Sequence, residues 1–256
     1  MKWIICILCF LFLFNFNSSY AEEIFISFTP GFEDIVILDG TWSFQEEWKR
    51  SSLDGLNESI GFKIAHDKQY LFAYLSAVND QTPSKLSDRG ILCIDGNNNK
   101  SQKPDSDDYC FIAIMGREQI ISLQGGGYNA HQGFYQEIKN HPEIIGIGGI
   151  SNSFDRFSDT THNTFEFKIP IEVIGRNNVY GIYYGVFDSN TGKQYGGPNN
   201  EYEEKYPFIP SPNVWGTLIS PDKSLPEMPM PLLILSILFV GIIIMTKTKG
   251  LPIISK

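Results

Sequence analysis

Hydrophobic and polar residues follow a short-period pattern along the middle of the chain. Seven runs rich in β-branched and aromatic residues are separated by turn residues, as is typical of β-strands. In the sixth run, Phe165, Phe167 and Ile169 alternate with polar side chains, the pattern of a strand with one buried face. The sequence therefore predicts strands over residues 60–65, 70–78, 90–95, 109–115, 119–123, 164–169 and 179–188.

Helical periodicity is scarce by comparison. Residues 42–50 are compatible with a short helix that carries Phe44 and Trp48 on one face, and residues 170–175 with one turn that begins at proline and ends at glycine. Glycine clusters at 125–127 and 146–149 predict turns or bulges. Many short strands with few helices predict an all-β fold, an antiparallel β-sandwich.

The N-terminus has the pattern of a secretory signal peptide. Lys2 precedes an apolar run over residues 3–14, and Ser19 and Ala21 supply the small residues that a signal peptidase requires. Cleavage after Ala21 removes two of the four cysteines and leaves the rest of the chain in a compartment where a disulfide persists.

A second apolar run, residues 228–246, lies near the C-terminus. Its 19 residues span roughly 28 Å as a helix, enough for a bilayer core. Lysines follow it, which predicts a cytoplasmic tail and an extracellular domain anchored in the cell membrane by a single pass. The predicted segments are a signal peptide (1–21), a β-sandwich ectodomain (22–219), a stalk (220–227), a transmembrane helix (228–246) and a cytoplasmic tail (247–256).

The segment L-P-E-M-P-M-P before this run, with basic residues after it, resembles the tripartite sorting tails of archaeal surface proteins. In those PEF-type tails a Pro-Glu-Phe signature precedes a membrane helix. Met228 replaces the usual Phe here. Both cleavage by a sorting enzyme and retention as an anchor therefore stay open.

The exported part of the chain is strongly acidic. It keeps 16 of the 20 basic residues and 28 of the 29 acidic ones, a net charge of -12. Because no basic stripe is present to neutralise phosphates, we do not expect nucleic acid as a partner.

Cys93 and Cys110 enclose a loop with seven Asp and Asn residues. They are the only cysteines of the predicted mature protein, so they form either a disulfide or two free thiols. A disulfide would close a loop of about 18 residues and stabilise the fold by roughly 3 kcal/mol.

This loop is a candidate calcium site. Asp95, Asn97 and Asn99 alternate as in the first half of an EF-hand loop, but Lys100 stands where the EF-hand has glycine. The predicted ligands of a structural calcium ion are Asp95, Asn97, Asn99, Asp105, Asp107 and Asp108. An ordinary solvated hairpin loop is the alternative, because Asp, Asn and Ser all favour turns.

Two glycosylation sequons lie on the predicted extracellular side, at Asn57 and Asn99. Since a glycan at Asn99 competes with its use as a calcium ligand, the two interpretations of this residue exclude each other.

The order of segments between about residues 39 and 215 resembles the family 9 carbohydrate-binding-module-like domain. The resemblance is carried by D-G-T-W-S-F-Q-E-E-W, I-A-H-D-K-Q-Y-L-F-A-Y-L, D-R-G-I-L-C-I-D, F-E-F-K-I-P-I and V-Y-G-I-Y-Y-G-V-F-D. It implies a DOMON-like sandwich of two antiparallel sheets, with Asp39, Gly40 and Trp48 as markers of the opening turn. It also implies calcium after Asp95 and binding of sugars, whereas relatives that share the fold bind haem.

Sugar binding requires an exposed aromatic ring near polar groups. The candidate platform residues are Trp42, Tyr128, Tyr195 and Trp215, which lie off the predicted helix face or in turn-rich segments. Haem would require axial ligands such as Met115 with one of the four histidines, yet His66, His131, His141 and His162 all lie beside turn residues, which favours solvated loops.

No sequence motif of a hydrolase or a zinc enzyme is present, so we predict that the chain is not an enzyme. The leading hypothesis is a membrane-anchored extracellular module that binds carbohydrate or a glycoconjugate and uses calcium structurally. Two alternatives stay open: a structural surface or adhesion protein without a sugar site, and a haem-binding electron-transfer domain.

Overall fold

The computed structural model describes residues 23–57, 59–127, 134–198, 201–202 and 208–220. Among these residues no helix is long and apolar enough to cross a membrane. The predicted signal peptide and the predicted spanning segment both lie outside the described residues. Both therefore stay predictions.

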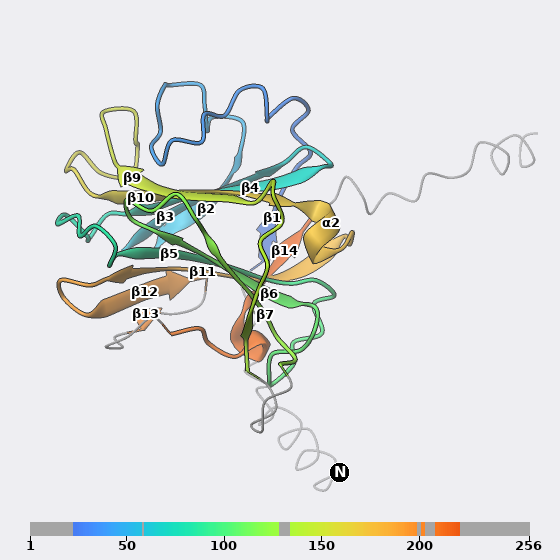
Figure 1. The fold of residues 1–256 in the computed structure, drawn as a ribbon. Helices are drawn as coiled ribbons and strands as arrows, with labels where there is room; N and C mark the ends of the chain where they lie inside the picture. Colours follow the sequence, from blue (N-terminus) through green and yellow to red (C-terminus); the bar gives the residue numbers. More distant parts are fainter. Residues whose placement is uncertain (1–22, 58, 128–133, 199–200, 203–207, 221–256) are drawn as a thin grey trace, which may run out of the picture.

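Two β-sheets form the molecule (Figure 1). The nine-stranded sheet contains β1 (Glu23–Phe25), β14 (Gly216–Ile219), β11 (Val179–Asp188), β5 (Arg89–Asp95), β6 (Asp108–Ile114), β7 (Ile121–Gln124) and β8 (Gln136–Ile138), with β12 (Lys193–Gly197) paired to β11 and β13 (Glu201–Tyr202) paired to β12. The five-stranded sheet has the order β2 (Ser52–Asn57), β3 (Ile60–His66), β4 (Tyr70–Ala77), β10 (Asn163–Pro170) and β9 (Ile145–Ile150). The strand pairs are antiparallel except β1 with β14, which is parallel.

The main core lies between the two sheets. Side chains from β3, β4 and β10 pack there against side chains from β5, β6 and β11. Phe62 and Tyr184, one from each sheet, stack with ring centroids 4.0 Å apart and are almost completely buried. Burying a side chain of this size stabilises the fold by about 1.5–3 kcal/mol. The predicted β-sandwich is thus confirmed, with the parallel β1–β14 pair as its one departure.

Residues 42–50 do not form the predicted helix; residues 45–50 form turns instead. Trp42 and Trp48 are both buried against Tyr74 of β4, at 1% and 0% exposure. Six residues apart, they would point about a third of a turn away from each other on a helix. Both therefore reach one sheet only because the chain turns. The other predicted helical turn is present as α2 (Ile171–Ile174).

The segment before β2 covers the outer face of the five-stranded sheet (Figure 1). Glu166 of β10 holds it in place. One carboxylate oxygen accepts hydrogen bonds from the backbone N–H groups of Asp39 and Gly40 at 3.0 and 2.8 Å, and the other accepts one from Nε1 of Trp48 at 2.9 Å. Burial raises the pKa of Glu166 well above its usual range, against the effect of these hydrogen bonds.

Cys93 and Cys110 form a disulfide, as predicted. They lie directly opposite each other on β5 and β6, with Cα atoms 4.1 Å apart. Both are fully buried on the outer face of the nine-stranded sheet, where Tyr183 and Trp215 pack beside them. The disulfide closes the base of the acidic loop.

The glycine-rich segment 146–149, predicted as a turn or bulge, lies within strand β9. The space beside Gly146 is filled by the side chain of Ile120, and the space beside Gly148 by the ring of Phe165. Glycine permits this close packing against the strand because it has no Cβ.

Candidate functional site

A hollow of about 270 Å³ lies at the loop that joins β9 to β10. Each residue that lines it carries a hydroxyl, an amide or a carboxylate. The lining residues are Ser151, Asn152, Ser153, Asp155, Ser158, Asp159, Thr160 and Thr161.

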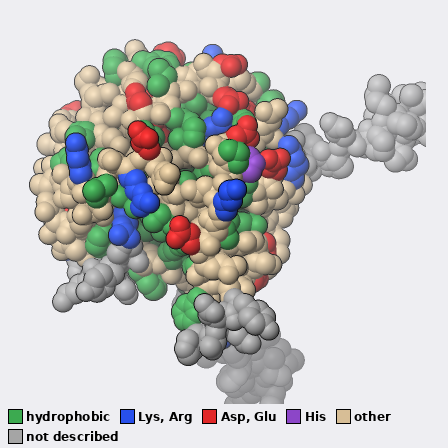
Figure 2. All heavy atoms as spheres, viewed as in Figure 1, with side chains coloured by type: hydrophobic (Ala, Val, Ile, Leu, Met, Phe, Trp, Pro, Cys, Tyr) green, Lys and Arg blue, Asp and Glu red, His purple; other side chains and the backbone are tan. Residues whose placement is uncertain are grey.

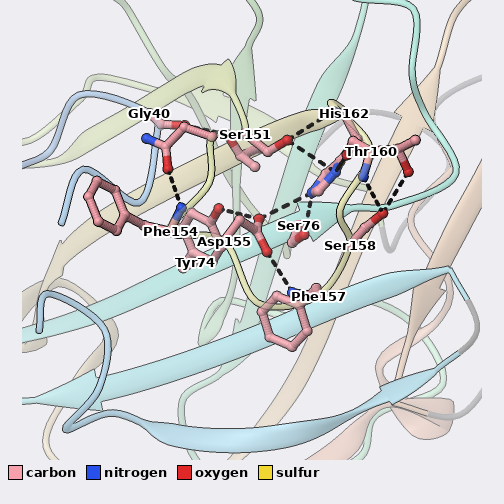
Figure 3. Close-up of polar contacts among 12 residues, drawn as sticks. Gly40, Tyr74, Ser76, Ser151, Phe154, Asp155, Phe157, Ser158, Thr160 and His162 are labelled. Carbon is pink, nitrogen blue, oxygen red and sulfur yellow. Dashed lines mark hydrogen bonds and ion pairs between the residues drawn. The ribbon is translucent and has the colours of Figure 1, made fainter. Parts of the chain in front are cut away.

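A buried polar network beneath the hollow fixes this loop (Figure 3). The Asp155 carboxylate oxygen Oδ2 accepts a hydrogen bond from the Tyr74 hydroxyl at 2.7 Å and lies 3.1 Å from Nε2 of His162. Its other oxygen accepts the backbone N–H of Phe157 at 2.8 Å. Ser76 of β4 lies 2.6 Å from the same His162 nitrogen. The network therefore ties the middle of the loop to a core strand.

His162 also holds the two ends of the loop together. Its Nδ1 lies 2.6 Å from the carbonyl oxygen of Thr160 and 3.1 Å from the hydroxyl of Ser151, and its backbone N–H donates to that hydroxyl at 2.9 Å. Burial raises the pKa of Asp155, but the hydrogen bonds from His162, Phe157 and Tyr74 outweigh it, so that the pKa is lowered. Asp155 is thus held as a carboxylate inside the loop.

Ser76, His162 and Asp155 combine the three residue types of a hydrolytic triad, but their arrangement differs from one. In a triad the serine and the carboxylate contact opposite nitrogens of the imidazole. Here both contact Nε2. Ser76 and His162 are also 0% exposed, so the would-be nucleophile and base are out of reach of a substrate. Their geometry is that of a structural support for the loop.

The rim of the hollow, in contrast, is accessible. Ser153, Asp159 and Thr161 are exposed, and within the described residues their side chains form no hydrogen bond. The Asn152 side-chain oxygen accepts the backbone N–H of Phe154 at 2.9 Å, which leaves its NH₂ group available. Phe154 is 41% exposed, and Figure 3 shows its ring pointing away from His162.

Two of the predicted sugar-platform residues are not exposed, so the expectation of an open ring is wrong for them. Trp42 is 1% exposed; its Nε1 donates to the carbonyl oxygen of Phe44 at 2.8 Å. Trp215 is 1% exposed; its Nε1 donates to the carbonyl oxygen of Pro210 at 2.9 Å. Large rings that satisfy their one polar group internally stabilise the fold best when buried.

The other two platform residues have different outcomes. Tyr195 is half-buried and packs against the main core. Tyr128 lies outside the described residues. The exposed aromatic rings of the described residues are instead Phe25, Phe134, Phe154 and Phe208.

The loop between Cys93 and Cys110 is organised by hydrogen bonds to its own backbone. The Asp95 carboxylate accepts the N–H groups of Asn97, Asn99 and Lys100 at 3.2, 3.3 and 3.1 Å. Lys100 has the left-handed conformation (φ 54°) that an EF-hand assigns to glycine. Its ammonium group leaves the loop and donates to the carbonyl oxygens of Trp215 and Gly216 at 2.5 and 2.6 Å.

The remaining acidic groups of this loop repel one another. Burial, followed by the neighbouring Asp105, raises the pKa of Asp107 to about 6. Burial also raises the pKa of Asp108 to about 7, with Asp95 and Asp105 contributing. One carboxylate oxygen of Asp107 and one of Asp108 are buried without a hydrogen-bond partner. A cation would compensate these charges.

No three carboxylates of this loop converge, however. Among the described residues, groups of three side chains whose ligand atoms lie within 4.8 Å of one another are formed by His141, Glu143 and Glu172 and by Asp80, Asp88 and Asp188, not by the loop. Asn97 and Asn99 are exposed, and the Asn99 side-chain NH₂ donates to Asp105 at 2.9 Å. Calcium in this loop and the glycan at Asn99 both stay predictions. The side chain of Asn57 lies outside the described residues.

The expectation of solvated loop histidines is wrong for His66 and His162. They are 3% and 0% exposed, and Nε2 of His66 lies 3.0 Å from the Ser220 hydroxyl. His141 is partly exposed and pairs with Glu172 at 3.1 Å. His131 lies outside the described residues, and Met115 is 4% exposed in the main core.

Figure 2 shows one face of the molecule, on which basic and acidic side chains are interspersed without a continuous basic stripe. This face offers no extended cationic surface for a phosphate backbone.

The chain matches no protein-family model and no curated protein. Similar solved structures include a family 9 carbohydrate-binding module from Caldicellulosiruptor kristjanssonii. Its complex with cellotriose is 13% identical, with a TM-score of 0.44, over 78% of this chain and 93% of that chain. Its complex with glucose is 13% identical, with a TM-score of 0.41, over 78% of this chain and 95% of that chain.

Proposed function

We propose that the protein binds carbohydrate or a glycoconjugate without transforming it, and that the hollow at the β9–β10 loop is the binding site. The observation that carries the proposal is the lining of this hollow, which consists entirely of hydroxyl, amide and carboxylate side chains. Sugar hydroxyls require such partners, since each both donates and accepts hydrogen bonds. The volume of about 270 Å³ is near the lower end of small-molecule sites, roughly 300–1,000 Å³, and suits one sugar ring.

The support beneath the hollow favours binding. Asp155 and His162 hold the loop from below, so the rim of the hollow is already ordered before a ligand binds. Preorganisation of this kind increases affinity because less conformational entropy is lost on binding. Phe154, exposed on the same loop, offers a ring face to a further sugar unit.

The setting of this site in the cell is part of the proposal. The signal peptide at 1–21 and the apolar segment 228–246 favour a single-pass protein of the cell membrane whose sandwich faces the outside. The resemblance to family 9 modules favours a sugar ligand and a structural calcium ion in the Cys93–Cys110 loop.

Binding of the full-length, detergent-solubilised protein to a glycan array tests this proposal. We expect retention of at least one glycan, and an affinity about ten-fold lower or more for Asp159→Ala, because a charge-assisted hydrogen bond contributes about 1.5–3 kcal/mol. The matched control is Asp34→Ala, which removes another exposed aspartate far from the lining residues in sequence. No retained glycan at high protein density, or equal losses in both variants, would contradict the proposal.

A further inference from the structure

Four polar residues, two from each sheet, meet at one end of the sandwich. Asp80 follows β4, and Asn163 begins β10, the neighbouring strand in the five-stranded sheet. Asp88 precedes β5, and Asp188 is the last residue of β11, its neighbour in the nine-stranded sheet. Because both strand pairs are antiparallel, the end of one strand lies beside the start of the other. We call these four residues the inter-sheet cluster.

The three carboxylates of the inter-sheet cluster are close together and buried. Oxygen atoms of Asp80, Asp88 and Asp188 lie within 4.8 Å of one another, and the three residues are 0%, 0% and 1% exposed. None of them forms an ion pair with a lysine or arginine of the described residues. Buried like charges without a counter-charge are strongly unfavourable. Within the part of the chain that the structure describes, the group therefore lacks a positive partner.

Asn163 supplies a second, independent observation. It is 0% exposed, and its NH₂ group donates to Asp80 at 2.5 Å and to Asp88 at 2.8 Å. Its side-chain oxygen lies on the other side of the amide from the NH₂ group and is buried without a hydrogen-bond partner among the described residues. Leaving a buried acceptor unsatisfied costs about 1–3 kcal/mol. An amide oxygen is a good ligand for a hard cation, and a turn of the side-chain amide would bring this oxygen to the carboxylates.

We propose that Asp80, Asp88, Asp188 and Asn163 bind one calcium ion that joins the two sheets. All four offer oxygen ligands, which hard cations prefer, and nitrogen or sulfur ligands of the kind that hold zinc are not among them. Calcium fits better than magnesium, because calcium accepts six to eight oxygens in irregular geometry, whereas magnesium requires near-octahedral geometry and retains several waters.

The carboxylates are already held in position for this role. The Ser189 backbone N–H and hydroxyl donate to one oxygen of Asp88 at 3.0 and 2.6 Å. Asp188 accepts the N–H of Asn190 at 2.8 Å. Hydrogen bonds of this kind orient metal ligands before the ion arrives. Both oxygens of Asp80 and Oδ2 of Asp188 accept one hydrogen bond each and so keep a lone pair for a cation. Each oxygen of Asp88 accepts two hydrogen bonds, and a turn of the Asn163 amide would free one position on its Oδ2.

A cation at this point would connect the β4–β5 segment, β10 and the end of β11, and so would hold the two sheets together. Its effect on stability can be measured without a sugar ligand, because the inter-sheet cluster shares no residue with the lining of the hollow.

Thermal unfolding of the full-length protein tests the proposal after treatment with EDTA and then with CaCl₂. At 100 times the dissociation constant, we expect calcium to raise the Tm by about 5–10 °C. Asp188→Asn keeps the shape of the side chain and removes its charge, so it should abolish most of this rise. Asp34→Asn, at an exposed aspartate outside both acidic regions, is the matched control and should retain it. No rise in the wild type, or an undiminished rise in Asp188→Asn, would overturn the proposal.

A second variant keeps the test decisive if Asp188→Asn does not fold. Asn163→Asp replaces the amide by a fourth carboxylate and removes the NH₂ donor. A calcium ligand at this position predicts a larger calcium-dependent rise in Tm than in the wild type. A residue that acts only through its NH₂ hydrogen bonds predicts a destabilised protein with no larger rise, which would count against calcium. An equal rise with MgCl₂ would overturn the choice of calcium.

Discussion

Two regions of the molecule gather acidic side chains, and they are built in different ways. In the Cys93–Cys110 loop the acidic residues are close in sequence. The Asp95 carboxylate accepts hydrogen bonds from three backbone N–H groups of the same loop. In the inter-sheet cluster the residues are spread from Asp80 to Asp188 and come together only where four strands end. The loop is closed by a disulfide, whereas the cluster has no covalent link.

This difference shows what brings ligands together. Neighbours in a loop compete for local hydrogen bonds, since Asp and Asn side chains readily accept backbone N–H groups one to five residues away. Carboxylates at strand ends accept such groups too, since Asp80, Asp88 and Asp188 accept the backbone N–H groups of Thr82, Ser84 and Asn190. Strand pairing nevertheless brings these carboxylates together from distant parts of the chain, with oxygen atoms within 4.8 Å of one another. Convergence of oxygen ligands is thus stronger evidence for a cation than their density in the sequence.

The largest effect that we predict concerns the covalent closure of the loop. The double variant Cys93→Ser and Cys110→Ser should lose about 3 kcal/mol of unfolding free energy, because a loop of about 18 residues is then unconstrained in the unfolded chain. Urea unfolding of the full-length protein measures the loss. The calcium-dependent rise in Tm should persist in this variant if it originates in the inter-sheet cluster. Loss of that rise together with the disulfide would assign the calcium to the loop.

A pH titration separates the two regions without mutation. Burial, followed by the charges of Asp88 and Asp188, raises the pKa of Asp80 to about 7. Burial raises the pKa of Asp108 in the loop to about 7 as well. Between pH 4 and about 7 the folded chain holds protons on these groups that the unfolded chain has released. Raising the pH through this window therefore destabilises the calcium-free protein.

We expect the unfolding free energy in EDTA to fall by about 2 kcal/mol from pH 5 to pH 7. This value is smaller than the full pKa shifts of Asp80 and Asp108 imply, because solvent screening and relaxation of the protein reduce their effect on stability. Calcium at the inter-sheet cluster should remove the part of this fall that arises from Asp80, whereas the part that arises from Asp108 persists unless an ion also occupies the Cys93–Cys110 loop. Denaturant unfolding at each pH, with and without calcium, measures both parts. A fall that calcium removes completely would indicate that the loop binds the ion too.

The sequence predicts the regular part of this fold well and the irregular part poorly. Alternation at Phe165, Phe167 and Ile169 predicts β10 because these three side chains all face the main core. The expectation of a solvated opposite face is wrong, since Thr164 and Glu166 are buried there as well. Strand β9 is missed because glycine carries no hydrophobic signal, although Gly146 and Gly148 are required by the packing of their neighbours. Residues 42–50 are misassigned because tertiary burial of two tryptophans overrides helical spacing.

The sequence predicts less of the candidate sites than of the fold. The polar stretch S-N-S-F-D-R-F-S-D-T-T-H of the β9–β10 loop is a signal that marks this loop in the sequence. Nothing local, however, links it to Tyr74 and Ser76 of β4. The same holds for Asp80 and Asp188, since their proximity follows from strand order and register rather than from spacing along the chain. Pairing of distant strands depends on the whole sandwich.

The smallest predicted effect has opposite signs in the two regions. At pH 8 the Asp108 carboxylate is ionised while buried, and one of its oxygens has no partner. Asp108→Asn removes this charge, and the amide oxygen can still accept the Asp105 N–H that Asp108 accepts at 2.7 Å. We expect the variant to be about 1 kcal/mol more stable than the wild type at pH 8 in EDTA. At the same pH, with calcium present, Asp188→Asn should instead be less stable. Denaturant unfolding of both variants, in EDTA and in calcium, measures these changes in unfolding free energy.

Destabilisation by Asp108→Asn in calcium, but not in EDTA, would show that Asp108 is itself a calcium ligand. The two acidic regions would then differ in how strongly they bind calcium, and not in whether they bind it.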